Sequence, residues 1–192
     1  MTRHRRLVLL LAGLLLLAFV APMSASAQEN TTDKYTEDEV LEASKQFFGD
    51  TSKDLATIIE KIFKDQGEPN AYITGEEAAG AIAVGLRYGN GWLHRKAGGN
   101  RRVFWQGPSL GFDLGGNASK VFTLVYNLGG TNDIFQRFPG IEGTVYVVGG
   151  FGVNYQQRGN VILAPIRTGV GLRAGANIGY LHYTREQEIL PF

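Results

Sequence analysis

Residues 104–127 read FWQGPSLGFDLGGNASKVFTLVYN, and this stretch decides the fold class. It contains two runs rich in β-branched and aromatic residues, which are typical of strands. Glycines separate the runs, and glycine tolerates positive φ angles and close approach of the backbone, so it marks bends and bulges in a sheet. The stretch therefore predicts a small and strongly curved β-structure.

The same pattern extends over most of the chain, because 23 of the 26 glycines lie between residues 71 and 184. Many short strands at regular spacing indicate an antiparallel barrel or sandwich. We predict strands at residues 71–74, 80–88, 91–95, 102–106, 109–113, 120–127, 143–155, 160–168 and 176–184, with one short helix at 131–138. Turns are expected at Gly89-Asn90-Gly91, Gly98-Gly99-Asn100, Gly115-Gly116-Asn117 and Gly159-Asn160.

Both faces of the central predicted strands are apolar. In the run 120–127, the side chains of one face alternate with those of the other: Phe122, Leu124 and Tyr126 against Val121, Thr123 and Val125. Strands that are apolar on both faces are covered on both sides. We therefore expect a mainly β fold, in which an antiparallel barrel of about eight strands has a filled interior and helices against its outer surface.

Two amphipathic helices precede the predicted strands. Thr36 and Glu39 have the spacing of a capping box, which begins a helix that ends at Gly49. A second helix is predicted from about Ser52 to Gln66, ending at Gly67. Its apolar residues form one continuous stripe: Leu55, Ile58, Ile59, Ile62 and Phe63. Both helices are expected to pack against the barrel.

The N-terminus has the pattern of a secretory signal peptide. Basic residues precede the apolar run 7–20, and Ala25 and Ala27 supply the small residues of a cleavage site. The run has 14 residues, fewer than the roughly 20 that cross a bilayer. We expect cleavage after Ala27, a flexible tail at 28–35 and a single domain at 36–192, divided into a helical segment (36–67) and a barrel (71–192). No later run predicts a transmembrane segment, so the expected location is the periplasm.

Composition excludes several classes of function. The chain has no cysteine, so it has no disulfide and no thiolate metal site. Cleavage of the signal removes three arginines and no acid, which changes the net charge from +1 to −2. Residues 28–70 carry net −6 and residues 71–192 carry net +4, too weak a basic footprint for nucleic-acid binding. Two histidines remain, His94 and His182, which do not suggest a metal site. We expect no cofactor and no metal.

Four residues are candidates for ligand binding: Trp92, Trp105, Arg167 and Arg173. Aromatic rings and guanidinium forks suit glycans and phosphates. The alternative for each tryptophan is structural packing. The alternative for Arg167 and Arg173, which share a strand face with several glycines, is that they are solvated residues beside a tight bend.

The whole pattern resembles the EipA-type periplasmic envelope-integrity proteins of Gram-negative bacteria, a family long catalogued as a domain of unknown function. The resemblance lies in the following motifs: Thr36-Glu37-Asp38-Glu39, Phe47-Phe48-Gly49, Gly75-Glu76-Glu77-Ala78, Gly85-Leu86-Arg87-Tyr88-Gly89, Trp105-Gln106-Gly107-Pro108-Ser109-Leu110-Gly111-Phe112-Asp113, Leu124-Val125-Tyr126-Asn127-Leu128, Gln136-Arg137-Phe138, Gly149-Gly150-Phe151-Gly152, Pro165-Ile166-Arg167-Thr168-Gly169-Val170-Gly171, Gly179-Tyr180-Leu181 and Pro191-Phe192.

This resemblance implies a soluble periplasmic protein with an eight-stranded barrel and a role in keeping the cell envelope intact. It implies no reaction. A fainter similarity to SYLF-type phospholipid-binding domains favours a lipid as ligand. The sequence therefore predicts a non-catalytic periplasmic protein that binds an envelope lipid, a polysaccharide or a partner protein.

Two alternatives belong to other functional classes. An integral outer-membrane barrel would also have a signal peptide, many glycines and a terminal Phe192, but membrane barrels alternate apolar-out with polar-in. A hydrolase could use Gly107-Pro108-Ser109-Leu110-Gly111, followed in order by Asp133 and His182. Such a nucleophile elbow needs a strand, a sharp turn and then a helix, and the residues after Gly111 do not favour a helix.

Overall fold

The computed structural model describes residues 33–82, 84–110, 118–168 and 179–188. Two helices come first, α1 (Glu37–Phe48) and α2 (Lys53–Gln66). The Thr36 side chain accepts a hydrogen bond from the Glu39 backbone, and the Glu39 carboxylate accepts one from the Thr36 backbone, so the predicted capping box is present. Ser52 caps α2, and both helices end at a glycine with positive φ, Gly49 and Gly67.

The described residues also form one antiparallel sheet of ten strands. The strands are β1 (Ala71–Ile82), β2 (Val84–Arg95), β3 (Asn100–Leu110), β4 (Ser119–Tyr126), β5 (Arg137–Pro139), β6 (Tyr146–Val148), β7 (Phe151–Val153), β8 (Gln156–Arg158), β9 (Val161–Thr168) and β10 (Tyr180–Thr184). A short 3₁₀ helix, η2 (Thr131–Ile134), lies between β4 and β5.

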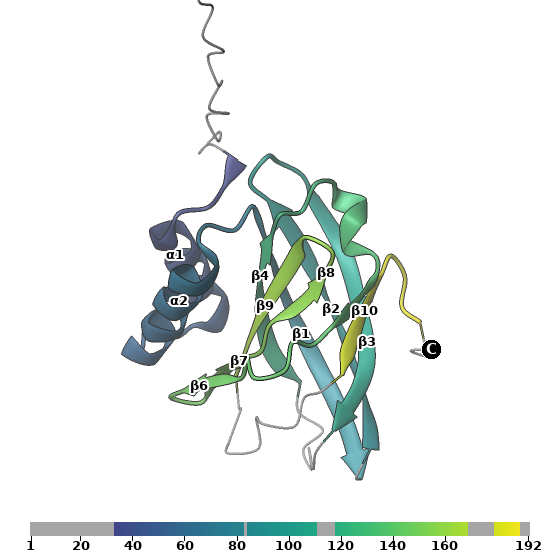
Figure 1. The fold of residues 1–192 in the computed structure, drawn as a ribbon. Coiled ribbons are helices and arrows are strands. Elements are labelled where there is room, and N and C mark those ends of the chain that lie inside the picture. Colours follow the sequence, from purple (N-terminus) through teal and green to yellow (C-terminus); the bar gives the residue numbers. More distant parts are fainter. Residues whose placement is uncertain (1–32, 83, 111–117, 169–178, 189–192) are drawn as a thin grey trace, which may run out of the picture.

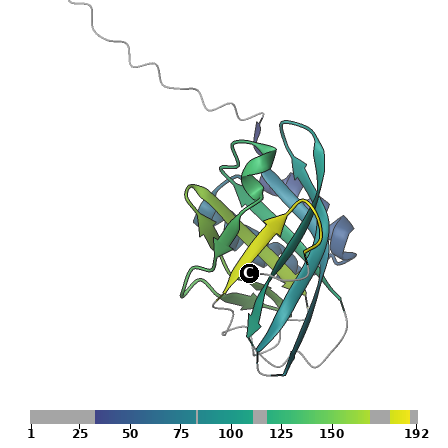
Figure 2. The same ribbon diagram turned by 90° about the vertical axis from the view of Figure 1, so that its right-hand side faces the viewer.

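Eight of these strands roll into a barrel (Figures 1 and 2). Their order is β5-β10-β3-β2-β1-β4-β9-β8, in which neighbours pair along the sheet. The two ends of this series, β5 and β8, meet at one bridge between Gly140 and Gln156, beside a hydrogen bond from Ile141 N to Tyr155 O. The hairpin of β6 and β7 pairs with the C-terminal end of β9, on the same edge as β8 and opposite β4, and it lies under the helices. The predicted barrel is confirmed.

Two apolar cores lie on opposite faces of the sheet. The inner core fills the barrel and includes Ile73, Trp105, Val125, Leu163 and Tyr183. The outer core lies between the helices and the outer surface of β4, β9 and β7: it includes Ile58 and Ile62 of α2 with Phe122, Leu124 and Ile166 of the sheet. The alternation predicted for the run 120–127 is therefore present, with each face of β4 buried against a different core.

The turn predicted at Gly89-Asn90-Gly91 is wrong, because these residues lie inside β2. Gly75 and Gly91 are direct partners on β1 and β2, and a Cβ on either would lie less than 2.5 Å from a carbonyl oxygen of the other strand. These glycines therefore permit close approach of two long strands. Residues 102–106 and 109–110, predicted to lie in two strands, belong to one strand, β3, which runs through Gly107 and Pro108 without a break. Residues 111–113 of the second predicted strand lie outside the described residues.

Two further expectations on strands and helices need correction, and one strand was not expected. The predicted helix at 131–138 is the shorter η2 followed by β5. The predicted strand at 143–155 is the β6–β7 hairpin, which turns at Gly149 and Gly150, both with positive φ. Strand β8 was not predicted at all. The turns at Gly98-Gly99 and Gly159 are confirmed by their positive φ angles.

The turn expected at Gly115-Gly116-Asn117 and the signal peptide, with Ala25 and Ala27, lie outside the described residues. In the part of the chain that the structure describes, no helix has the length and apolar character needed to cross a membrane.

Candidate functional site in the barrel lumen

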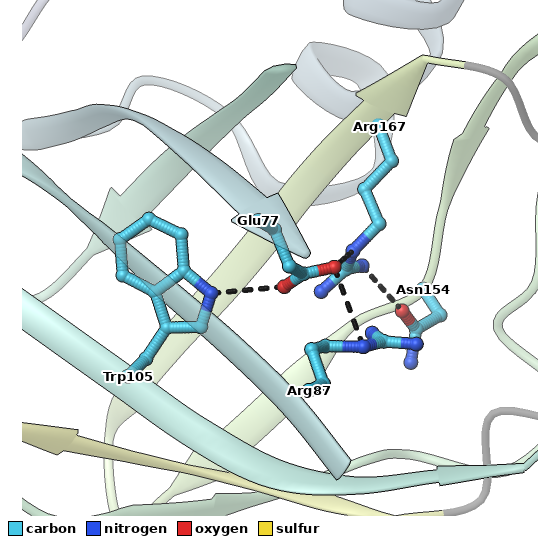
Figure 3. Close-up of polar contacts among 5 residues, drawn as sticks. All are labelled: Glu77, Arg87, Trp105, Asn154 and Arg167. Atoms are coloured by element: carbon cyan, nitrogen blue, oxygen red, sulfur yellow. Dashed lines mark hydrogen bonds and ion pairs between the residues drawn. The ribbon is translucent and has the colours of Figure 1, made fainter. Parts of the chain in front are cut away.

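A buried cluster of polar side chains lies inside the barrel, surrounded by the inner core. It consists of Glu77 on β1, Arg87 on β2, Trp105 on β3, Arg167 on β9, and Asn154 in the connection between β7 and β8 (Figure 3). The side chains of β1 at positions 71, 73, 75 and 77 share the inward face of the strand by alternation. We call these five residues the lumen cluster.

The Glu77 carboxylate is at the centre of the lumen cluster. Its Oε1 accepts a hydrogen bond from Arg167 Nε at 3.0 Å and lies 3.3 Å from Arg87 Nε. Its Oε2 accepts a hydrogen bond from Trp105 Nε1 at 2.9 Å. Figure 3 shows the indole on one side of the carboxylate and the two guanidinium groups on the other. Arg167 Nη1 continues the network by donating to Asn154 Oδ1 at 3.2 Å.

The register of the strands places these groups together. Glu77 pairs with Gly89 of β2, and Gly89 pairs with Trp105 of β3, so the three residues form one row across the sheet. Because Gly89 has no side chain, the indole lies over its backbone: an added Cβ would be 2.1 Å from Trp105 Cε2. Gly75 also leaves room for the indole, since an added Cβ there would lie 2.6 Å from Trp105 Cη2. The glycines thus direct Trp105 Nε1 toward Glu77.

All three charged side chains of the lumen cluster are buried, with 6% of Glu77 and 7% of each arginine exposed. Burial by itself would raise the pKa of Glu77, but attraction to Arg167 and Arg87, together with the hydrogen bonds from Arg167 and Trp105, outweighs it and lowers that pKa below its ordinary value. Glu77 is therefore ionised at neutral pH.

The Tyr183 ring packs beside the Trp105 indole, with 5.7 Å between the two ring centroids. Burial raises the pKa of Tyr183, and the negative charge of Glu77 raises it further, against the opposing effect of the arginines. Tyr183 is therefore neutral and adds no negative charge to the lumen cluster.

The structure brings together two of the four predicted ligand-binding residues, Trp105 and Arg167, since both donate to the same carboxylate. The alternative of a solvated Arg167 is wrong, because its guanidinium is buried in the lumen. Trp105 is a core residue, as its structural alternative predicted, and also a member of the cluster. Arg173 lies outside the described residues.

Trp92 does not join the lumen cluster. It lies on the outer face of β2, with 46% of its surface exposed. The Arg102 guanidinium lies 5.5 Å from the Trp92 ring and 5.4 Å from the Phe104 ring, and it donates a hydrogen bond to Asn90 Oδ1. Trp92 is therefore part of a separate, solvent-facing group of aromatic and polar side chains.

Sequence reasoning missed Glu77, Arg87 and Asn154 as members of the site. A signal for Glu77 was present, because this residue falls on the same alternation as Ala71 and Ile73, which are buried. A charged residue at an inward position of an apolar strand predicts a buried partner. The partner could not be named, because Arg167 is 90 residues away in the sequence.

The stretch proposed for a hydrolase has a different local structure from a nucleophile elbow. Gly107, Pro108, Ser109 and Leu110 lie within β3, where Ser109 pairs with Gly85 of β2. Gly111 lies outside the described residues. Over the described ranges, no three His, Cys, Asp or Glu side chains gather in a way that could hold a metal ion.

A family model for envelope integrity protein A (EipA) matches residues 33–192. The chain belongs to this family. The resemblance noted in the sequence is therefore confirmed, and it places all five members of the lumen cluster within the EipA region. The family's name connects its members with the integrity of the cell envelope.

A crystal structure of a beta-barrel-like, uncharacterized protein from Brucella abortus is similar to this EipA-family chain. The two sequences are 48% identical, the TM-score is 0.76, and the alignment covers 83% of this chain and 99% of that chain. Comparison with curated proteins gives no match.

Proposed function

We propose that this EipA-family chain is a non-catalytic periplasmic protein that supports envelope integrity by binding an envelope lipid, an envelope glycan or a partner protein. The observation that carries the binding proposal is the lumen cluster, in which a buried arginine keeps a hydrogen-bond donor without a partner among the described residues (Arg167 Nη2). An unpaired buried donor destabilises the fold, and a bound ligand that accepts from it would remove this cost. Family membership supports the connection with the envelope.

The distribution of polar and apolar residues favours a barrel that works in water. Membrane barrels carry apolar side chains outside and polar ones inside. Here most of the barrel interior is apolar, with Thr123 and Gln156 as further buried polar residues beside the lumen cluster, and the outer face of β4 and β9 is covered by α1 and α2. Exposed outward positions on β1 and β2 include Glu76 and Asn90. This arrangement is the inverse of a membrane barrel, which supports the periplasmic proposal over the outer-membrane alternative.

Fractionation of cells separates these two possibilities. We expect osmotic shock to release the processed chain in the supernatant, with an N-terminus near Gln28. Retention in the membrane pellet until detergent is added would contradict the proposal. Retention of residues 1–27 in the mature protein would contradict export by a cleaved signal.

The envelope role is tested by deleting the gene and measuring growth on detergents and on envelope-directed antibiotics. We expect the deletion strain to be more sensitive and the wild-type gene to restore tolerance. A gene carrying Arg167→Gln is expected to restore little tolerance, whereas Trp92→Ala, on the outer face, is expected to restore it fully. Unchanged tolerance after deletion would contradict the envelope role. If Arg167→Gln restored tolerance and Trp92→Ala did not, the binding surface would lie on the outer face and not in the lumen.

A further inference from the structure

An open cleft lies at one end of the barrel, between the loop that carries η2 and the turn that joins β8 to β9 (Figure 1). Its volume is about 570 Å³, which falls within the roughly 300–1,000 Å³ of small-molecule sites. Two segments that are distant in the sequence, 127–136 and 158–161, form its walls. The polar or charged residues that line it are Asn127, Asn132, Asp133, Gln136, Arg158 and Asn160. The cleft is therefore a candidate site for a ligand that forms many hydrogen bonds.

The cleft is present because strand pairing does not close this end of the barrel. β5 and β8 meet at the antiparallel bridge between Gly140 and Gln156, so residues before Gly140 lie opposite residues after Gln156. On this side of the bridge, no backbone pairing joins the two stretches within the described part of the chain. Gln136 lines the cleft from one stretch, and Arg158 and Asn160 line it from the other. Polar side chains thus lie where the strand pairing stops.

Asn127 connects the two walls of the cleft. Its Nδ2 donates a hydrogen bond to the backbone oxygen of Asn160 at 3.0 Å. Among the described residues, Asn127 is the only non-glycine residue with a positive φ, 57°, a region that asparagine adopts more readily than most residues do. Such a backbone conformation persists where the surrounding structure holds it. The cleft is therefore preformed, and a ligand would not have to order it.

Three polar side chains on the cleft use one atom to fix their own position. Asn132 Oδ1 accepts a hydrogen bond from Arg185 Nη2 at 3.0 Å. Asp133 Oδ2 accepts one from the Gly130 amide at 2.7 Å. Gln136 Nε2 donates to the Asp133 carbonyl at 2.6 Å. In the described part of the chain, the second polar atom of each side chain keeps no protein partner and is available to a ligand.

Two further side chains on the cleft are exposed, those of Arg158 and Asn160. Within the described ranges, neither side chain makes a hydrogen bond or an ion pair with another residue. The structural role of Asn160 is carried by its backbone oxygen, which accepts from Asn127. Both side chains can therefore bind a ligand without giving up a contact that holds the fold.

The composition of the cleft indicates the chemistry of its ligand. Six of the ten lining residues are polar or charged, which does not suit an acyl chain. Asp133 and Arg158 are the two charged residues of the lining, and their charges cancel, which does not suit a polyanion. The other four polar residues carry side-chain amides, which both donate and accept hydrogen bonds, as hydroxyl groups do. A ligand with many hydroxyl groups and no net charge, a saccharide, matches this lining.

We propose that the cleft binds a neutral saccharide, as one segment of a glycan chain that continues into solvent. Asn132, Asp133, Gln136 and Asn160 exchange hydrogen bonds with its hydroxyl groups. Arg158 donates to the same ligand from the end of β8.

The cleft is separate from the lumen cluster. Ser119, at the start of β4, pairs with Glu77, whereas Tyr126, at the end of β4, adjoins Asn127 of the cleft. A strand of this length spans roughly 20 Å. The inference therefore goes beyond the proposed function, and it does not depend on a ligand in the lumen.

The test is a titration of the purified, isotope-labelled mature chain with chitotetraose and, in a second experiment, with maltotetraose, followed by NMR spectroscopy. We expect saturable shifts of the amide signals of residues 127–136 and 158–161, including the side-chain amide of Asn160. Chitotetraose carries acetamido groups, and maltotetraose carries only hydroxyl groups. Tighter binding of chitotetraose supports a glycan of amino sugars as the source of the ligand. Equal or tighter binding of maltotetraose supports a glycan without acetamido groups.

Two variants test whether the saccharide binds in the cleft. Asn160→Ala should weaken binding about two- to tenfold, as expected for the loss of one hydrogen bond. Arg158→Gln should weaken it about tenfold, because hydrogen bonds from a charged donor are stronger than neutral ones. Arg102→Gln is the matched control, since Arg102 is an exposed arginine on the outer face of β3, and it should bind like the wild type. Circular dichroism should show that all three variants are folded.

Two results would overturn the inference. The first is that neither sugar shifts the signals of the cleft; if inorganic polyphosphate shifted them instead, Arg158 would belong to an anion site. The second is that Asn160→Ala and Arg158→Gln both bind the sugars as tightly as the wild type does. These assays need no cells, so unchanged envelope tolerance of the deletion strain would contradict the proposed function without affecting the saccharide site.

Discussion

The indole of Trp105 occupies the space that a side chain on Gly89, its direct cross-strand partner, would fill. An added Cβ on Gly89 would lie 2.1 Å from Trp105 Cε2 and 2.3 Å from Nε1. The same Nε1 donates to Glu77. The absence of a side chain on one strand therefore determines the hydrogen bond made by a residue on the next strand.

Gly89→Ala should destabilise the fold by about 1–3 kcal/mol, because it overpacks a filled interior. The measurement is the denaturant midpoint of unfolding. Gly130→Ala is the control, since an added Cβ there would meet only the Asp133 carboxylate at 3.6 Å, and it should change stability by less than about 0.5 kcal/mol. Equal stability of Gly89→Ala and the wild type would contradict the packing of Trp105 described above.

Glu77→Gln should be more damaging, with a loss of about 3–5 kcal/mol, because it removes the buried negative charge that the guanidinium groups of Arg87 and Arg167 share. The adjacent acid provides a matched control: Glu76 lies on the opposite face of β1 and is exposed. Glu76→Gln should leave stability nearly unchanged. Chemical denaturation of both variants checks this prediction, and similar midpoints for the two would refute it.

Acid should destabilise the protein partly through Glu77. The pKa of this carboxyl is lowered in the folded state, so its contribution is fully present above the unfolded value of about 4.3 and is lost as pH falls from there through the folded pKa. Among the described residues, the groups that face it are Arg87, Arg167 and Trp105. Unfolding curves measured at a series of pH values should therefore show a weaker acid dependence for Glu77→Gln. The same acid dependence in both proteins would exclude this role.

The hydroxyl of Tyr155 connects the barrel to α2, since it donates a hydrogen bond to Asp65 Oδ2 at 2.7 Å. Tyr155→Phe removes this hydrogen bond to a charged acceptor. It should lower the free energy of unfolding by about 1–2 kcal/mol, at the lower end of the range for such bonds, because the Asp65 side chain is partly exposed. Tyr146→Phe is the control, because it also removes a tyrosine hydroxyl but keeps the aromatic ring that Lys61 contacts. A larger effect for Tyr146→Phe in thermal unfolding would contradict this account.

The local features of the fold could be predicted because they depend on neighbouring residues. Thr36 and Ser52 begin helices through hydrogen bonds that reach three residues along the chain. The alternation in β4 is also local, and it indicated that the strand is buried on both faces. Gly49 and Gly67 ended the helices as expected.

The features that could not be predicted depend on contacts between distant residues. Gly89-Asn90-Gly91 has the composition of a turn, but the indole of Trp105 lies on it and the segment stays in β2. The lumen cluster was predicted only in part, because Trp105 and Arg167 suggest a ligand by their chemistry alone. Glu77, which joins them, becomes recognisable as their partner only when β1, β3 and β9 are placed around one interior.

The bridge between Gly140 and Gln156 is the only backbone pairing between β5 and β8 in the described residues, whereas β5 pairs with β10 over three residue pairs. Local unfolding separates first the strands that share the fewest hydrogen bonds. We call this pairing of β5 and β8 the seam of the barrel. Among the described pairs of neighbouring barrel strands, separating these two requires the least free energy. In hydrogen exchange, the Ile141 amide, which bonds to Tyr155 across this seam, should lose its protection before the amides of β1 and β2 do.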